Sequence, residues 1–118
     1  MEIYKKFSFD SAHYLPNLPD GHKCKRMHGH TFYVIVFVKG TVEPKIGWIK
    51  DFFEIKQIFQ PILDQLDHRL LNEIDGLENP TSEHLVKWIW VRLKKVLPEL
   101  SKIEVSETCT TGCFYKGE

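Results

Sequence analysis

Two histidines separated by one glycine, His28 and His30, are the residues of this sequence best suited to hold a metal ion. On a β-strand, residues two apart lie on one face, so both imidazoles can reach the same ion. A third histidine, His13, ends an earlier segment with a strand-like pattern. Three imidazoles with an open fourth position are typical of a catalytic zinc site. The sequence therefore predicts Zn²⁺ at His13, His28 and His30, although His-X-His pairs also arise by chance in packed or surface strands.

Cys24 lies four residues before His28, on a loop that also carries Lys23, Lys25 and Arg26. A thiol close to a metal ion and to basic side chains is held more readily as its thiolate. Cys24 is therefore a candidate base or nucleophile. Two other roles stay open, those of a fourth zinc ligand and of an inert loop cysteine.

Two carboxylates, those of Asp67 and Glu107, are expected to interact with a histidine, a cation or a ligand. Asp67 precedes His68 just after a predicted helix, where a carboxylate can orient an imidazole and raise its basicity; the alternative is an ordinary polar pair at a helix end. Glu107 shares a predicted strand face with Ile103 and Val105. Because a buried unpaired carboxylate is costly, Glu107 is expected to meet a protein cation or a ligand that presents N–H donors.

Six predicted elements position these residues. Alternation places Phe9, Ser11 and His13 on one face of the first strand. The segment that begins at His28 is a continuous apolar, β-branched and aromatic run, typical of a buried strand. Helical periodicity follows in two later segments. The expected elements are strands at 2–14, 28–40, 102–108 and 113–117 and helices at 51–66 and 82–97.

Both predicted helices have recognisable ends. Asp51 with Glu54 three residues later is a capping-box pattern, and Pro61 is expected to kink or divide that first helix. The second helix stops at Pro98 and has a wide apolar stripe. The stripe consists of Leu85, Val86, Ile89, Trp90, Leu93, Val96 and Leu97.

The order β-β-α-α-β-β predicts an α+β fold in which two helices pack on one face of an antiparallel sheet. The second strand is apolar on both faces, since Val34 and Val36 alternate with Tyr33, Ile35 and other apolar residues. A sheet covered on one face only is expected to alternate apolar and polar residues. The second face is therefore expected to be buried in an oligomer.

The composition narrows the class of protein. At 118 residues and 42% hydrophobic content, the chain has the size of one domain, 1–118. Sixteen basic residues balance sixteen acidic ones, so no global field attracts nucleic acid or a membrane. No membrane span or signal peptide is visible. The three cysteines are expected to be reduced thiols of a cytoplasmic protein, with Cys109 and Cys113 structural.

Five motifs carry a family resemblance: CKRMHGH at 24–30, GWIKDF at 47–52, LDHRLLN at 66–72, ENPTSE at 78–83 and SETCTTGC at 106–113. In this order they resemble the 6-pyruvoyl-tetrahydropterin synthase superfamily along essentially the whole chain. Pyruvoyl-forming members usually have the cysteine two residues farther from HGH. The three-residue spacer between Cys24 and His28 therefore resembles the carboxy-forming branch.

The resemblance implies the T-fold, in which such subunits close into barrels with the helices outside. It implies a homohexamer built from two trimers, with active sites between subunits. It also implies a pterin triphosphate as substrate. In the carboxy-forming branch, 7,8-dihydroneopterin triphosphate is converted to 6-carboxy-5,6,7,8-tetrahydropterin, acetaldehyde and triphosphate in queuosine biosynthesis.

The resemblance also implies a role for each matching residue. Zn²⁺ is expected to act as a Lewis acid on oxygens of the substrate side chain. Lys23, Lys25 and Arg26 are candidates for triphosphate contacts, with a solvated loop as the alternative. Two other functions stay open: a pyruvoyl-forming or sepiapterin-processing enzyme, and a non-catalytic zinc-binding assembly module closed by Cys24. The implied roles are zinc ligands at His13, His28 and His30, general base at Cys24, proton relay at Asp67 and His68, and pterin anchor at Glu107.

Overall fold

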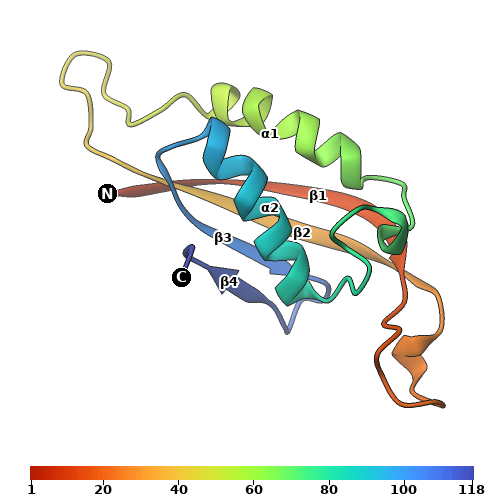
Figure 1. Ribbon diagram of the computed structural model, residues 1–118. Helices are drawn as coiled ribbons and strands as arrows, with labels where there is room; N and C mark the ends of the chain where they lie inside the picture. The colour runs from red at the N-terminus through yellow and green to blue at the C-terminus, as the bar shows by residue number, and fades with distance from the viewer.

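The molecule has two layers, an antiparallel sheet of four strands and two helices that cover one of its faces (Figure 1). The computed structural model describes residues 1–118. The strands lie side by side in chain order. Along the chain, strands and helices follow one another in the predicted order β-β-α-α-β-β. The elements are β1 (Glu2–His13), β2 (His28–Lys39), α1 (Phe52–Leu66), α2 (Ser82–Val96), β3 (Leu100–Ser106) and β4 (Cys113–Tyr115).

The register of β1 against β2 decides which side chains share a face. His13 lies opposite His28, and Ser11 lies opposite His30. Phe9, Ser11 and His13 share one face of β1, as predicted, and all three are buried. The face that they share is the one that packs on the helices. Its core contains Phe32, Val34, Val36, Val105, Phe59, Leu85, Ile89 and Leu93.

Helix α1 differs from the prediction in two details, the contact made by Glu54 and the effect of Pro61. Asp51 caps it, because the Phe53 N–H donates to Asp51 Oδ1 at 3.0 Å, whereas Glu54 forms an ion pair with Lys50 at 3.4 Å instead of completing a capping box. Pro61 does not divide the helix, which runs unbroken from Phe52 to Leu66. Pro61 lies on the exposed face, so the backbone carbonyl that it leaves unpaired can be solvated.

Helix α2 is capped by Thr81, whose Oγ1 accepts a hydrogen bond from the His84 N–H at 3.2 Å. The predicted apolar stripe is correct except at its edges. Val96 is 56% exposed, whereas Trp88, which was not expected in the stripe, is buried. Trp88 can be buried there because its Nε1–H donates to the Asp75 carbonyl at 3.0 Å. Neither helix is long and apolar enough to cross a lipid bilayer.

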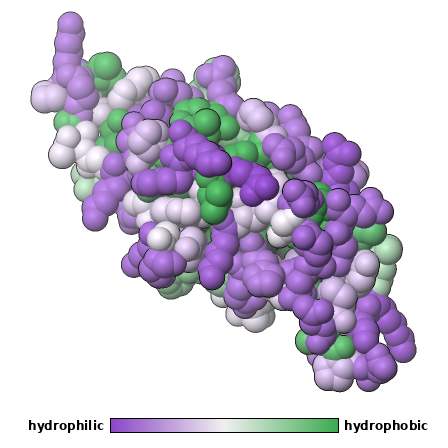
Figure 2. Space-filling view, in the orientation of Figure 1, coloured by the Kyte–Doolittle hydropathy of each residue, from purple (hydrophilic) through white to green (hydrophobic).

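The two faces of the sheet differ in how well they are covered. Over the helices the surface is mostly hydrophilic with separate apolar patches (Figure 2). On the opposite face, Tyr4, Tyr33 and Phe114 are 53%, 50% and 63% exposed. Lys102 lies over the rings of Phe37 and Phe114, 4.2 and 5.3 Å from their centroids. The second apolar face of the sheet is therefore left open by the single chain.

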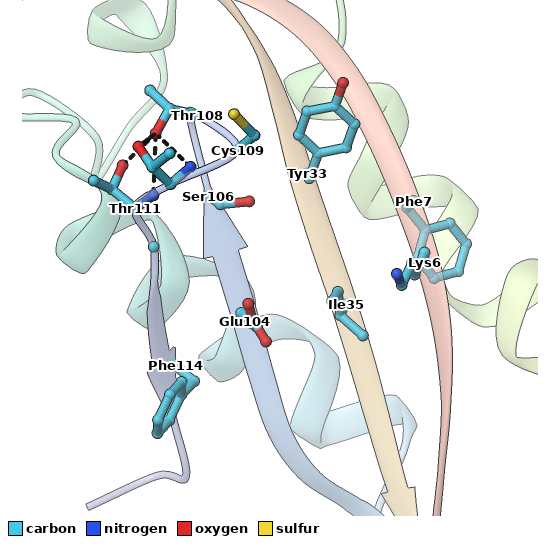
Figure 3. A pocket seen from close by; sticks show the side chains of 12 residues that line it. Lys6, Phe7, Tyr33, Ile35, Glu104, Ser106, Thr108, Cys109, Thr111 and Phe114 are labelled. Carbon is cyan, nitrogen blue, oxygen red and sulfur yellow. Dashed lines mark hydrogen bonds between the residues drawn. The ribbon is translucent and has the colours of Figure 1, made fainter.

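That open face contains a cavity of about 500 Å³ near the β3–β4 turn (Figure 3). Tyr33 of β2 and Phe114 of β4 stand on either side of Glu104 and Ser106 of β3. The turn is held by the Thr108 hydroxyl, 2.6 Å from that of Thr111. None of the predicted metal-binding, catalytic or substrate-binding residues lines this cavity.

Candidate active site

His13, His28 and His30 meet at one end of the sheet, with one ring nitrogen of each within 4.8 Å of the others. His13 ends β1, while His28 and His30 open β2 on the same face. The antiparallel register therefore brings together residues that lie fifteen or more positions apart in the chain. This confirms the predicted three-histidine cluster.

Backbone carbonyls orient two of these rings. His13 Nδ1 lies 2.9 Å from the Pro80 carbonyl oxygen, and His28 Nδ1 lies 2.7 Å from the Arg26 carbonyl oxygen. A carbonyl only accepts, so in each ring Nδ1 carries a proton, and in the neutral ring Nε2 keeps a lone pair. His13 Nε2 is buried and has no hydrogen-bond partner. A buried nitrogen without a partner is costly unless a further group binds it.

Burial lowers the pKa of His13 below its ordinary value of 6.5, against an opposing effect of its hydrogen bond to Pro80. The neutral imidazole, which is the form that binds metals, is therefore favoured. Three imidazoles, each with one ring nitrogen within 4.8 Å of the others, are a ligand set that suits a transition-metal ion. The cluster can thus hold a metal ion. Hydrogen bonds to the Pro80 and Arg26 carbonyls fix the orientation of the His13 and His28 rings.

Glu107 follows the last residue of β3, so it lies one position beyond the strand in which it was predicted. Its side chain is 24% exposed. Oε1 accepts a hydrogen bond from the Ser82 hydroxyl at 2.9 Å, and Oε2 lies 3.7 Å from His30 Nε2. Glu107 also lines a cleft of about 250 Å³ with Leu15. The sequence predicted a protein cation or an N–H ligand for this carboxylate; within the chain its partners are the Ser82 hydroxyl and His30 of the cluster, with a cleft open beside them.

Cys24 lies on the loop before β2, in a single 3₁₀ turn formed by Lys23–Lys25. Its N–H donates to His22 Nδ1 at 3.1 Å, and its carbonyl accepts from the Leu15 N–H at 2.9 Å. Its side chain is half-buried and free of any disulfide. The cluster of possible metal ligands does not include Cys24. Within this chain Cys24 is therefore not a fourth ligand of the histidine cluster.

The basic side chains of this loop differ from one another. Lys25 forms an ion pair with Asp20. Lys23 and Arg26 are exposed and form no ion pair. Two of the three candidate anion contacts are thus unpaired, and the third already has a carboxylate partner.

Asp67 and His68 lie in the turn after α1, along the outer edge of β1. His68 Nδ1 is 3.0 Å from Asp67 Oδ1, so the predicted pairing of carboxylate and imidazole is present. The Asp10 N–H also donates to Asp67 Oδ1, at 3.0 Å. This hydrogen bond, followed by the one to His68, lowers the pKa of Asp67. Neither residue forms a hydrogen bond or ion pair with the histidine cluster, although His68 and His30 both line one open cavity of about 570 Å³.

The backbone of this turn is unusual at His68, whose φ of 57° lies in the left-handed region. That conformation costs a residue with a Cβ roughly 1–2 kcal/mol. It persists here because the turn is bonded to β1: the His68 N–H donates to the Asp10 carbonyl at 2.7 Å, and the Ala12 N–H donates to the Arg69 carbonyl at 2.9 Å.

Three contributors to the site were not found from the sequence. The Pro80 carbonyl has no side-chain signal that could reveal it. Ser82 contacts Glu107 only because α2 begins beside the end of β3. Ser11 had a signal, since it is a hydroxyl on an otherwise apolar strand face, but its partners lie far along the chain.

Fold and site together define a class of protein. A four-stranded antiparallel sheet carries two helices on one face and a three-histidine cluster at one end. The family model described as 6-pyruvoyl tetrahydropterin synthase matches residues 2–118, and the chain belongs to that family. The resemblance predicted from the motifs is therefore confirmed.

The relatives differ in their activities. The 6-carboxy-5,6,7,8-tetrahydropterin synthase of Synechocystis sp. is 42% identical, over 96% of this chain and 91% of the relative. The dihydroneopterin monophosphate aldolase of Pyrococcus furiosus is 38% identical, over 81% of this chain and 77% of the relative. The human 6-pyruvoyl tetrahydrobiopterin synthase is 31% identical, over 99% of this chain and 92% of the relative.

Solved structures agree with the fold. The 6-pyruvoyl tetrahydropterin synthase of Caenorhabditis elegans superposes with a TM-score of 0.91 at 28% identity, covering 100% of this chain and 96% of that one. The Plasmodium falciparum protein of the same name superposes with a TM-score of 0.73 at 19% identity, covering 98% and 96%. The predicted T-fold is confirmed.

Proposed function

We propose that this protein is a zinc-dependent carbon–carbon lyase that acts on 7,8-dihydroneopterin triphosphate. With water as co-reactant, the products are 6-carboxy-5,6,7,8-tetrahydropterin, acetaldehyde and triphosphate. The observation that carries the proposal is the buried, unpartnered Nε2 of His13, which faces two further imidazoles beside the cleft of Glu107. The 42% identity to a relative named for this product supports the carboxy-forming reaction.

His13, His28 and His30 would hold the zinc ion. When bound, Zn²⁺ supplies Lewis acidity to oxygens of the substrate side chain. The remaining coordination position would be available to substrate because Cys24 lies outside the ligand cluster. This arrangement supports a catalytic centre over the alternative of a closed zinc module.

The other residues would bind the pterin and move protons. Glu107, already an acceptor for Ser82, would accept N–H donors from the guanidine-like edge of the pterin ring in the adjoining cleft. Cys24 would remove a proton from a side-chain carbon as thiolate. His68, oriented by the Asp67 carboxylate, would exchange protons with the side-chain hydroxyls. Lys23 and Arg26, with Lys25 if it releases Asp20, would contact the triphosphate.

The assembly that we propose is a homohexamer of two trimers in which neighbouring subunits complete each site. Two features of the single chain support it. The open face of the sheet exposes Tyr4, Tyr33 and Phe114, which favours burial against further copies. The Asp67–His68 pair forms no hydrogen bond or ion pair with the histidine cluster of its own chain, which favours a relay supplied to each metal centre by a neighbouring copy.

The setting that we propose is the cytoplasm, within queuosine biosynthesis. All three cysteines are free, which is compatible with a reducing compartment.

The direct test is to incubate the purified, zinc-loaded protein with 7,8-dihydroneopterin triphosphate and to identify the products by chromatography and mass spectrometry. We expect 6-carboxytetrahydropterin and one equivalent of acetaldehyde. Pyruvoyltetrahydropterin without acetaldehyde would instead identify the activity in the name of the human relative. Turnover of the monophosphate alone would favour the activity of the Pyrococcus relative.

A Cys24→Ala variant separates a catalytic centre from a closed zinc module. We expect zinc to stay bound at wild-type stoichiometry while turnover falls by about 10²-fold or more, the range for a lost general base. Cys109→Ala is the matched control, because Cys109 is an exposed cysteine on the opposite face of the sheet. Loss of zinc in Cys24→Ala alone would support the closed module.

A further inference from the structure

We propose that Ser11 is a positioning residue for the Asp67–His68 pair. Ser11 is only 7% exposed and lies on the apolar face of β1 between Phe9 and His13. A buried hydroxyl is unfavourable unless it is hydrogen-bonded, so its partners indicate its role. Because the pair is assigned to proton transfer, this role rests on the proposed function.

The Ser11 hydroxyl makes two hydrogen bonds to the backbone on either side of the pair. It donates to the carbonyl of Leu66, the last residue of α1. It accepts from the Arg69 N–H at 3.1 Å. The Leu66 carbonyl is one of those that a helix end leaves without an intrahelical partner. One side chain thus joins the end of α1 to the chain beyond His68 and closes the turn that contains both relay residues.

The other contacts of the turn do not replace this one. Two backbone hydrogen bonds hold the turn against the outer edge of β1. The His68 N–H donates to the Asp10 carbonyl, and the Ala12 N–H donates to the Arg69 carbonyl. Only Ser11 approaches from the buried side and links Leu66 directly to Arg69. His68 has a φ of 57°, an unfavourable value that persists only where its surroundings fix it. Loss of the Ser11 hydroxyl is therefore expected to let the turn relax and the His68 ring change direction.

The experiment compares Ser11→Thr with Ser11→Val. Threonine and valine have nearly the same shape and both favour strands, but only threonine keeps the hydroxyl. We expect Ser11→Thr to keep a kcat near that of wild type and Ser11→Val to lose at least about tenfold, the cost of a misplaced catalytic group. KM should agree within about twofold and zinc content should be equal, because neither variant changes the metal or pterin contacts. Ser11→Ala is a second hydroxyl-free variant if valine prevents folding.

A second measurement needs no substrate. Amide hydrogen exchange at Arg69 should be slow in the wild type and in Ser11→Thr and about tenfold faster in Ser11→Val, because the N–H loses its acceptor. The ¹⁵N signals of the His68 ring should report one tautomer in Ser11→Thr and a mixture in Ser11→Val. If the wild type does not turn over the triphosphate, the proposed function fails, and the exchange rates still decide whether Ser11 fixes the turn.

General destabilisation is controlled with Val38→Ala, a core variant at the far end of β2, ten residues from His28 and so roughly 33 Å away. We expect it to lower the melting temperature while kcat stays within about twofold of wild type. A kcat loss in Val38→Ala equal to that in Ser11→Val would overturn the proposal. So would equal kcat, or equally slow Arg69 exchange, in the threonine and valine variants.

Discussion

The histidine cluster and the Asp67–His68 pair are built in opposite ways. In the cluster, His13 is 1% exposed and the positions of the ligands follow from the register of two long strands. In the pair, the His68 side chain is 78% exposed and stands on a turn with a left-handed residue. The cluster therefore depends on the core of the fold, whereas the pair depends on a few hydrogen bonds to the edge of β1.

We therefore expect substitutions in the two regions to affect different properties of the protein. Changes in the cluster should alter metal content together with activity. Changes in the pair should alter the rate while the metal stays bound. The variants below test this separation.

The largest effect is expected from His28→Ala. Removing one of three ligands should abolish stoichiometric zinc binding and lower turnover by about 10³-fold or more, since a bound metal contributes several kcal/mol. Zinc is measured by elemental analysis and turnover by product formation. His84→Ala is the control, because His84 is an exposed histidine outside the cluster. One tightly bound zinc per chain in His28→Ala would contradict the assignment.

Asp67→Asn should lower kcat by about 10²-fold, in the range of a lost acid–base group, with zinc content unchanged. The asparagine keeps the shape but not the charge that orients the His68 ring. Steady-state kinetics separate the effect on kcat from the effect on KM. Asp64→Asn is the control, because Asp64 lies on the exposed side of α1 and accepts a hydrogen bond from Gln60. A wild-type kcat for Asp67→Asn would remove the pair from the mechanism.

Glu107→Gln should mainly weaken pterin binding. The loss of charge-assisted hydrogen bonds is worth about 1.5–3 kcal/mol, which corresponds to an increase in KM of roughly 10- to 100-fold. Glu104→Gln is the matched control, because Glu104 lies on β3 but faces the cavity of the open face. The pterin role is refuted if both variants bind substrate like the wild type.

The smallest effect concerns the stability of the metal-free protein. Because burial lowers the pKa of His13 below 6.5, the unfolded chain takes up this proton at a higher pH than the folded one. Stability should therefore fall as the pH drops from 7.5 through 6.5 to 5.5, with His13 contributing at most about 1.4 kcal/mol per pH unit. Urea unfolding at fixed protein concentration measures this slope. An equal slope in His13→Asn would show that the buried ring is not its source.

Local pattern was sufficient to predict most of the fold. The alternation in β1, the unbroken apolar run of β2 and the stripe of α2 each depend on neighbouring residues, so periodicity revealed them. The prediction that Pro61 could divide the first helix was wrong: Pro61 is exposed, so the carbonyl that it leaves unpaired can be solvated, and exposure is a tertiary property. Trp88 was missed because the acceptor of its N–H, the Asp75 carbonyl, comes from another segment.

For the candidate site too, the sequence predicted the residues but not their contacts. Residue types and spacing were sufficient to single out candidates, because metal ligands and proton carriers are few in kind, while their roles came from the family resemblance. The candidates are the three histidines, Cys24, the Asp67–His68 pair and Glu107. Their spatial relations were not available from spacing. Cys24 falls outside the ligand cluster, and Lys25 has Asp20 as a partner.

The sequence by itself determined the chemistry available to this protein: three imidazoles, a thiol, a carboxylate–imidazole pair and a carboxylate among apolar residues. Only the tertiary structure decided which of these groups meet. The β1–β2 register turned separate histidines into one cluster, and the Pro80 carbonyl left the His13 lone pair buried and unpartnered. The physical reason is that residue identity fixes what a group can bind, whereas contacts between distant segments fix its orientation and its exposure to water.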